Sequence, residues 1–232
     1  MNVIGTMLGE SSSLRRVVFQ NAWWRFLASG IAKVTRFVVV FFAARWLGPE
    51  TFGQYNYALS LASLAFIFSD WGINALLIRD INQGKPSSEA VSASIIAKVL
   101  VNTASAIVAL LVFYFVDQGA YFGLGLLLSL LLILSNIREI YINFFIAEKN
   151  NRLEFYATVV EIVASILLLV GMKHLFFGTA TYFAVFNIFI VFLTLVVSVW
   201  IAHRALTFRW TAVSKSAVLD LLKSGLPLAL FG

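Results

Sequence analysis

Phe26–Leu47 reads FLASGIAKVTRFVVVFFAARWL, an almost unbroken apolar run in which only Lys33, Arg36 and Arg45 are charged. A transmembrane α-helix needs about 20 predominantly apolar residues, and this run is long enough for one. It is also too long for the apolar region of a secretory signal peptide. The stretch therefore predicts a first membrane span that the protein retains, with cations inside it.

The composition of the whole chain favours a membrane protein. Of its 232 residues, 61% are hydrophobic and 12% are charged, whereas soluble domains contain about 25% charged residues. The net charge of +6 fits basic loops beside anionic lipid, and no basic patch with interleaved aromatic residues indicates nucleic-acid binding. Cysteine is absent and only two histidines occur, so we expect no metal site and no cofactor.

Five further apolar runs are long enough to span a bilayer. They are Tyr55–Ile78, Ala93–Val116, Tyr121–Ala147, Phe155–Phe177 and Thr179–Ala202. We therefore predict an all-α membrane protein with a six-helix transmembrane lobe over residues 26–202. A cytoplasmic segment over residues 1–25 precedes the lobe, and a polar cytoplasmic linker over residues 203–223 follows it. Residues 224–232 begin another apolar run, which we interpret as the truncated start of a seventh helix.

A short internal similarity suggests a second lobe. Leu27-Ala-Ser-Gly-Ile31 opens the first span, and Leu222-Lys-Ser-Gly-Leu226 opens the seventh. This suits a parallel repeat of two six-helix halves, although a five-residue match can also arise by chance. We expect the second lobe to be missing from a longer protein, and the sequence leaves open whether 232 residues are a fragment or a functional half.

The basic residues predict the orientation in the membrane, because cytoplasmic loops carry an excess of Lys and Arg. With a cytoplasmic N-terminus, the inner segments hold Arg15, Arg16, Arg25, Arg79, Lys85, Lys149, Arg152, Arg204, Arg209, Lys215 and Lys223. The outer segments hold only Arg45 and Lys173. We therefore place the N-terminus and the 203–223 linker in the cytoplasm.

Seven ionisable residues lie inside the predicted spans, where a central charge costs roughly 2.5–3.5 kcal/mol to insert. The cations are Lys33, Arg36, Lys98 and Arg138, and the acids are Asp70, Glu139 and Glu161. Each lies about 9–17 Å from the predicted cytoplasmic end of its span, at about 1.5 Å per residue. We predict that they line a hydrated lumen as a layer with one excess positive charge.

Helical spacing gathers these residues into polar stripes, since residues three or four apart share a helix face. The stripes are Ser29-Lys33-Arg36, Lys98-Asn102-Ser105, Asn136-Glu139-Asn143, Thr158-Glu161-Ser165 and Asn187-Thr194-Ser198. One polar stripe on each of five spans predicts a polar interior surrounded by a lipid-facing shell.

Structural roles are the alternative for several of these side chains. Lys98 is close enough to the interface to snorkel toward it. Arg138 and Glu139 can pair with neighbours only to stabilise the bundle, and Asp70 can neutralise a nearby cation.

Lys33 and Arg36 are harder to explain structurally, because two cations one turn apart repel each other. We therefore assign them to a substrate path. The competing interpretation is that Arg36 is neutralised by Asp70 or Glu139.

Enzymatic activity finds little support. No Gly-rich phosphate loop, nucleophile elbow or metal-ligand pair occurs. Glu139 and Glu161 are intramembrane carboxylates, which mark transport paths more often than catalytic bases. We expect a protein without catalytic residues.

Arg45–Ser60, RWLGPETFGQYNYALS, closely resembles the first external turn of bacterial oligosaccharide flippases. These belong to the multidrug/oligosaccharidyl-lipid/polysaccharide exporter superfamily. Asp70-Trp-Gly-Ile-Asn74, Arg79-Asp80 and Ala147-Glu-Lys-Asn-Asn-Arg152 resemble that family too. The resemblance covers roughly residues 15–232, and it implies one lobe of a protein that has two.

The resemblance implies a function and a set of partners. Such proteins move polyprenyl-diphosphate-linked oligosaccharides, such as O-antigen or other polysaccharide repeat units of lipopolysaccharide biosynthesis, across the bacterial plasma membrane by alternating access. The partners would be this lipid-linked substrate, membrane lipid, glycan polymerases and a coupling H⁺ or Na⁺. The candidate substrate-binding residues are Lys33, Arg36, Lys98, Arg138, Asn102, Asn136 and Asn143, and the candidate ion-coupling residues are Asp70, Glu139 and Glu161.

Two other functions stay open at this point. A multidrug cation antiporter of the same superfamily would need excess acids in its lumen, whereas this layer is slightly cationic. A membrane scaffold of a glycan assembly complex would transport nothing. The sugar, the coupling ion and the oligomeric state are not encoded in any motif that we find.

Overall fold

The computed structural model describes residues 3–116, 118–175 and 178–231, and it describes only the backbone of residues 3–18, 21, 172–175 and 229–231. Phe177 and Gly232, which end two predicted segments, lie outside the described residues. So do the side chains of Arg15, Arg16 and Lys173, which entered the orientation argument.

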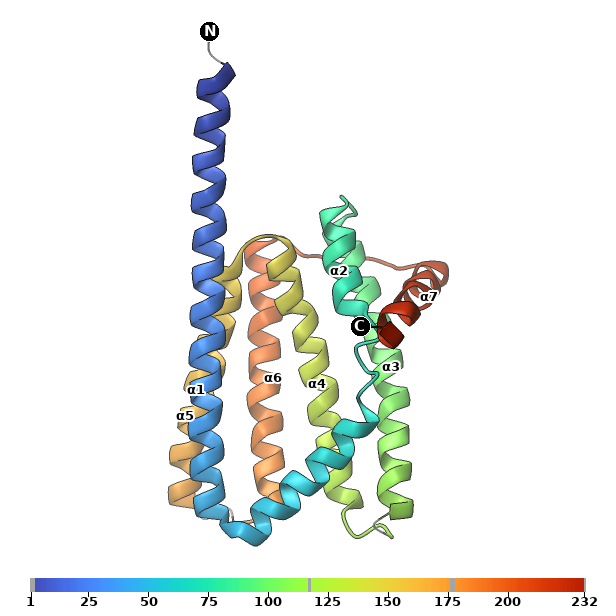
Figure 1. Cartoon of the computed structure of the whole chain (residues 1–232). Helices are drawn as coiled ribbons and strands as arrows, with labels where there is room; N and C mark the ends of the chain where they lie inside the picture. Colours follow the sequence, from blue (N-terminus) through green and yellow to red (C-terminus); the bar gives the residue numbers. More distant parts are fainter. Residues whose placement is uncertain (1–2, 117, 176–177, 232) are drawn as a thin grey trace.

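The described residues form seven helices and no strand (Figure 1), which confirms the all-α prediction. The helices are α1 (Val3–Ala65), α2 (Ile73–Asn82), α3 (Ser87–Val116), α4 (Phe122–Ala147), α5 (Asn151–Leu175), α6 (Ala180–Ala205) and α7 (Lys215–Phe231). The N-terminal part of α1 extends well beyond the bundle, and α7 lies beside α2 and α3.

Helix α1 consists of two helical pieces joined at Gly48. Gly48 has φ 78° and ψ 164°, and Pro49 follows it. Glycine adopts positive φ without a steric penalty, and proline suits the first turn of the new helix because its missing N–H is not needed there. The chain turns sharply there and runs obliquely across the bundle (Figure 1). The predicted first span therefore lies before this turn, and the predicted second span begins after it.

The second predicted span, Tyr55–Ile78, is interrupted in the structure. The helix ends at Ala65, the backbone makes successive turns, and α2 begins at Ile73. Trp71 and Gly72 have φ values of 48° and 67°, and two consecutive left-handed residues cannot continue a right-handed helix. Residues 66–72 are called the break below.

Two apolar clusters hold the helices of the bundle together at its opposite ends. The first includes Phe113, Leu128 and Phe183, and the second includes Ile140 and Phe145. Helix α4 contributes its first half to one cluster and its second half to the other. The middle of the bundle is left for polar groups.

Five helical stretches are long and apolar enough to cross a membrane. They are Ala22–Ala65, Ser87–Val116, Phe122–Ala147, Asn151–Gly171 and Ala180–Ala205. Large apolar side chains such as Phe37, Phe115 and Leu167 are at least 66% exposed, which lipid tolerates and water does not. The chain is a multi-pass membrane protein.

Helix α7 begins earlier than the apolar run from Ser224 indicates. The backbone N–H of Ala217 donates to the hydroxyl of Ser214 at 3.2 Å, so Ser214 caps a helix that starts at Lys215. The connection from α6 is attached to α3, because the N–H of Thr211 donates to Ser92 Oγ at 3.3 Å. Val218 and Leu221 then pack on an apolar cluster of α2 and α3.

Candidate functional site

A polar cavity of about 380 Å³ lies in the middle of the bundle, between both pieces of α1 and helices α4, α5 and α6. Its polar lining consists of Thr35, Arg36, Tyr55, Asn56, Ser135, Arg138, Glu161, Ser165 and Asn187. Among these, two guanidinium groups face one carboxylate. The cavity therefore carries one excess positive charge.

Arg36 is a cation of this cavity that no acid of the described residues neutralises. Its side chain is exposed, and among the described side chains no carboxylate lies within ion-pair distance of it. The alternative in which Asp70 or Glu139 neutralises Arg36 does not occur, because both acids contact Lys98 instead. Arg36 keeps its donors available to an anion in the cavity.

Arg138 and Glu161 form an ion pair between α4 and α5 on the cavity wall. The pair agrees with a stabilising role, but Nε of Arg138 is buried without an acceptor among the described residues. A buried donor without a partner costs free energy. Nε of Arg138 is therefore a donor that the described residues leave unsatisfied.

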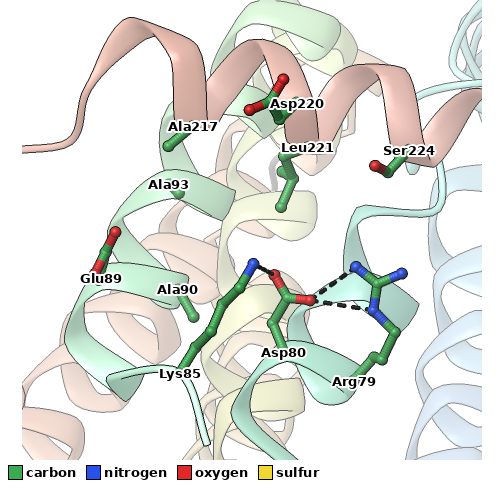
Figure 2. Close-up of a pocket in the computed structure, with 10 residues that line it drawn as sticks. All are labelled: Arg79, Asp80, Lys85, Glu89, Ala90, Ala93, Ala217, Asp220, Leu221 and Ser224. Atoms are coloured by element: carbon green, nitrogen blue, oxygen red, sulfur yellow. Dashed lines mark hydrogen bonds and ion pairs between the residues drawn. The ribbon is translucent and has the colours of Figure 1, made fainter. Parts of the chain in front are cut away.

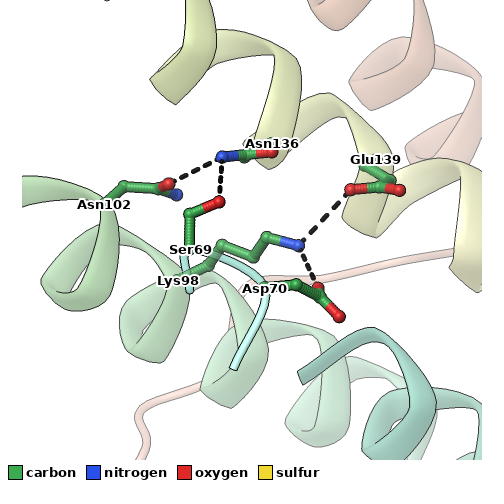
Figure 3. A network of polar contacts seen from close by, with 6 residues as sticks. All are labelled: Ser69, Asp70, Lys98, Asn102, Asn136 and Glu139. Atoms are coloured by element: carbon green, nitrogen blue, oxygen red, sulfur yellow. Dashed lines mark hydrogen bonds and ion pairs between the residues drawn. The ribbon is translucent and has the colours of Figure 1, made fainter. Parts of the chain in front are cut away.

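Lys98 is the centre of a second polar group, shown in Figure 3. Its ammonium group donates to Asp70 at 2.7 Å and to Glu139 at 3.5 Å. The Lys98 side chain is 0% exposed, whereas those of Asp70 and Glu139 are 49% and 51% exposed. Lys98 thus does not snorkel to an interface, and it is fully desolvated between two half-exposed acids.

Asn136 extends this group with two hydrogen bonds. Its amide donates to Ser69 Oγ at 3.0 Å and to Asn102 Oδ1 at 2.7 Å (Figure 3). Ser69 and Asp70 both belong to the break, so the break brings polar side chains to α3 and α4. Nδ2 of Asn102 is buried without an acceptor among the described residues. We call Ser69, Asp70, Lys98, Asn102, Asn136 and Glu139 the lysine cluster.

The single charged layer expected from the sequence is thus divided into two groups. Arg36, Arg138 and Glu161 line the cavity, whereas Asp70, Lys98 and Glu139 form the lysine cluster. Lys33 is exposed and Asn143 is partly buried, and neither belongs to the cavity lining or to the cluster.

Some side chains of the predicted polar stripes form their hydrogen bonds within their own helices. The hydroxyls of Thr158, Thr194 and Ser198 are buried and donate to backbone carbonyls four residues earlier. This is a common arrangement for Ser and Thr inside helices, so these side chains do not line the cavity. Asn187 of the same α6 stripe does line it.

The sequence patterns did not point to Thr35, Tyr55, Asn56 and Ser135 of the cavity lining, nor to Ser69 of the lysine cluster. Asn56 lines the cavity from the second piece of α1, and it falls inside the stretch that resembles the flippase turn. Ser69 joins the lysine cluster only because the helix ends before it. No periodic pattern marks that end.

A third polar group lies where α2 meets the start of α3 (Figure 2). The buried Asp80 carboxylate accepts from Arg79 at 2.8 Å and from Lys85 at 2.6 Å. Burial raises the pKa of Asp80, but the hydrogen bonds and charges of Lys85 and Arg79 outweigh it, so the pKa lies below its ordinary value. These residues line a pocket of about 220 Å³ that α7 covers with Ala217, Asp220, Leu221 and Ser224.

The family model described as "Polysaccharide biosynthesis protein" matches residues 18–231. No curated protein and no solved structure matches the chain.

Proposed function

We propose that this chain, which belongs to the polysaccharide biosynthesis protein family, takes part in flipping polyprenyl-diphosphate-linked oligosaccharides across the membrane. Membership of the family confirms the resemblance to oligosaccharide flippases. It makes the chain a multi-pass membrane protein of polysaccharide biosynthesis and export. The flipping step, its substrate and its mechanism belong to the proposal.

The observation that carries the proposal is Arg36 in the bundle cavity, where no described carboxylate pairs with it. A diphosphate concentrates negative charge on acceptor oxygens, and a guanidinium group binds such oxygens in a bidentate geometry. Arg138 supplies a second guanidinium on the same wall, and its pairing with Glu161 limits the excess charge to one. An excess of positive charge favours an anionic substrate over the organic cations of a multidrug antiporter.

The amides of the cavity suit the sugar part of such a substrate. Asn56 and Asn187 lie on its wall, and each uses its amide N–H to bond a carbonyl of its own helix. Their amide oxygens remain to accept hydrogen bonds from sugar hydroxyls. The exposed apolar surface of the bundle lets the polyprenyl chain stay in lipid.

Ion coupling is assigned to the acids. Asp70 and Glu139 share one buried cation, so together with Lys98 they carry one excess negative charge. H⁺ or Na⁺ binding at either acid would weaken its attraction to Lys98. Glu161 is the further candidate, because it pairs with Arg138 on the cavity wall.

Location and partners follow from the same proposal. We place the chain in the bacterial plasma membrane with a cytoplasmic N-terminus, as the Lys and Arg bias favours. A second lobe would face the cavity, and glycan polymerases would receive the flipped substrate.

The test is glycan export by this protein in a strain that lacks its own flippase. Arg36→Ala should abolish export, Arg36→Lys should lower it about tenfold because bidentate hydrogen bonds to a charged group are lost, and Lys33→Ala should weaken it less. Arg204→Ala, an exposed arginine at the end of α6, is the matched control and should export normally. Normal export by Arg36→Ala at unchanged membrane abundance would refute the diphosphate site.

A further inference from the structure

Helix α7 contacts the break through a specific hydrogen bond. The indole Nε1 of Trp71 donates to the backbone carbonyl of Leu222 at 2.9 Å, across 151 residues of sequence. Leu222 lies in the middle of α7, so its carbonyl accepts a side-chain donor in addition to its place in the helix. The contact fixes the Trp71 side chain against α7.

Two glycines let the backbones of α7 and the break approach closely. A Cβ on Gly225 would lie 2.2 Å from the carbonyl oxygen of Trp71, and a Cβ on Gly72 would lie 2.6 Å from Cβ of Leu228. A Cβ atom does not lie this close to a non-bonded atom in folded proteins, so α7 can take this position only with glycine at both sites.

No ion pair among the described side chains holds α7 against α2. Asp220 and Ser224 border the pocket that contains Arg79, Asp80 and Lys85 (Figure 2), yet Asp220 forms no ion pair with any described side chain. Besides apolar packing of Val218 and Leu221, the described residues of α7 contact the break at Trp71 and Gly72.

The same break orients Asp70. The Asp70 carbonyl accepts from the N–H of Ile73 at 2.8 Å, which closes a turn around the left-handed residues Trp71 and Gly72. The Asp70 carboxylate then bonds Lys98 at 2.7 Å. Because Asp70 is bonded directly to Trp71, any rotation of the turn redirects its carboxylate.

We propose that Trp71 in the break and Gly225 in α7 are positioning residues. The contact between them holds the Asp70 carboxylate on Lys98. The lysine cluster, inside the bundle, is thereby linked to a helix packed on its outer side. The proposal concerns the ion pair between Asp70 and Lys98, and only its consequence for transport rests on the proposed function.

Lys98 reports on the ion pair without any transport measurement. We propose to treat the full 232-residue chain with N-hydroxysuccinimidyl acetate and to quantify acetylation of Lys98 by mass spectrometry, with exposed Lys33 as the internal reference. In the unchanged chain Lys98 should be protected, since it is fully buried. Asp70→Asn gives the level that is reached when the pair is broken.

Trp71→Phe removes the indole N–H and keeps an aromatic ring, so Lys98 acetylation should rise about fivefold, as expected for one lost hydrogen bond. Gly225→Leu places atoms on the Trp71 carbonyl, so it should reach the Asp70→Asn level. Gly123→Ala adds a Cβ where nothing lies within 4 Å, and it should leave Lys98 protected. A cysteine at Ser129, which is 3% exposed on α4, should stay unlabelled by maleimide in every variant that is folded.

Lys98 protection that is unchanged in Trp71→Phe and in folded Gly225→Leu would overturn the proposal, as would unchanged protection in Asp70→Asn. If Gly225→Leu also exposes the cysteine at position 129, the chain has unfolded and Trp71→Phe alone decides. Loss of export in Arg36→Ala tests the transport proposal separately, because Arg36 does not touch the lysine cluster.

Discussion

Replacing Lys98 with methionine tests how much the lysine cluster contributes to stability. The ammonium group is fully buried and contacts two acids at 2.7 and 3.5 Å. Its removal leaves Asp70 and Glu139 without the cation between them. Breaking a buried ion pair costs about 3–5 kcal/mol, whereas an exposed pair contributes about 0–1 kcal/mol.

Both acids are about half exposed, so they can regain part of their hydration. We therefore expect a loss of about 2–3 kcal/mol in the free energy of unfolding, between the buried and exposed limits. For a chain of this size that corresponds to a thermal midpoint lower by about 5–10 °C. Methionine fills much of the lysine volume, so the cavity contribution is small.

The assay is thermal unfolding in detergent, followed by the fraction of protein that stays monodisperse. Lys33→Met is the matched control, since Lys33 is exposed and has no ion-pair partner among the described side chains. Combining Lys98→Met with Asp70→Asn and Glu139→Gln should restore most of the loss, because no uncompensated charge remains. A Lys98→Met midpoint equal to that of Lys33→Met, or a triple variant no more stable than Lys98→Met, would contradict the ion-pair argument.

Three further predictions concern orientation, helix packing and pH. The chain has no cysteine, so single cysteines report topology without background: positions 85, 149 and 215 should react with an impermeant maleimide only from the cytoplasm, and positions 51 and 118 only from outside. Reaction of position 51 from the cytoplasm alone would reverse the orientation. Gly125→Leu should lower the thermal midpoint sharply, because a Cβ there would lie 2.4 Å from the Phe113 ring and overpacking costs about 1–3 kcal/mol of unfolding free energy. Gly123→Leu, in open space, is the control and should change the midpoint little. The pKa of Asp80 is lowered in the fold, so its ionised form stabilises the protein at pH values above its ordinary pKa of about 3.9, and this stabilisation is lost as the pH falls through the lower, folded-state pKa. Asp80→Asn should accordingly cost about 1–2 kcal/mol at pH 7, and its unfolding curve should approach that of the unchanged chain as the pH falls through the lower, folded-state pKa.

The positions of the membrane helices could be predicted because their signal is local. The thickness of the hydrocarbon layer requires about 20 apolar residues in succession, and each span must form its backbone hydrogen bonds internally because lipid offers none. Ser87–Val116, Phe122–Ala147 and Ala180–Ala205 therefore lie close to the predicted runs. The turn at Gly48-Pro49 is equally local, since the two residue types dictate it.

The break at residues 66–72 could not be predicted in the same way. Phe66, Ile67 and Phe68 continue the apolar run, and Trp71 is not a residue that marks a helix end. The left-handed turn is stabilised by contacts with Leu222 and Gly225, which are separated from it by about 150 residues of chain. A window along the sequence contains none of these contacts.

The sequence by itself determined that this is an all-α membrane protein, and six of the seven ionisable residues predicted inside spans do lie in helices long and apolar enough to cross a membrane. The exception is Asp70, which lies in the break between two helices. Only the tertiary structure decided which of the cations are neutralised. Lys98 pairs with Asp70 and Glu139, 28 and 41 residues away, and Arg138 pairs with Glu161. This leaves Arg36 in the cavity with no acid from the described part of the chain. The physical reason is that insertion cost depends on residue type and depth alone, whereas an ion pair requires two groups within a few ångströms, and that distance is set by how the helices pack.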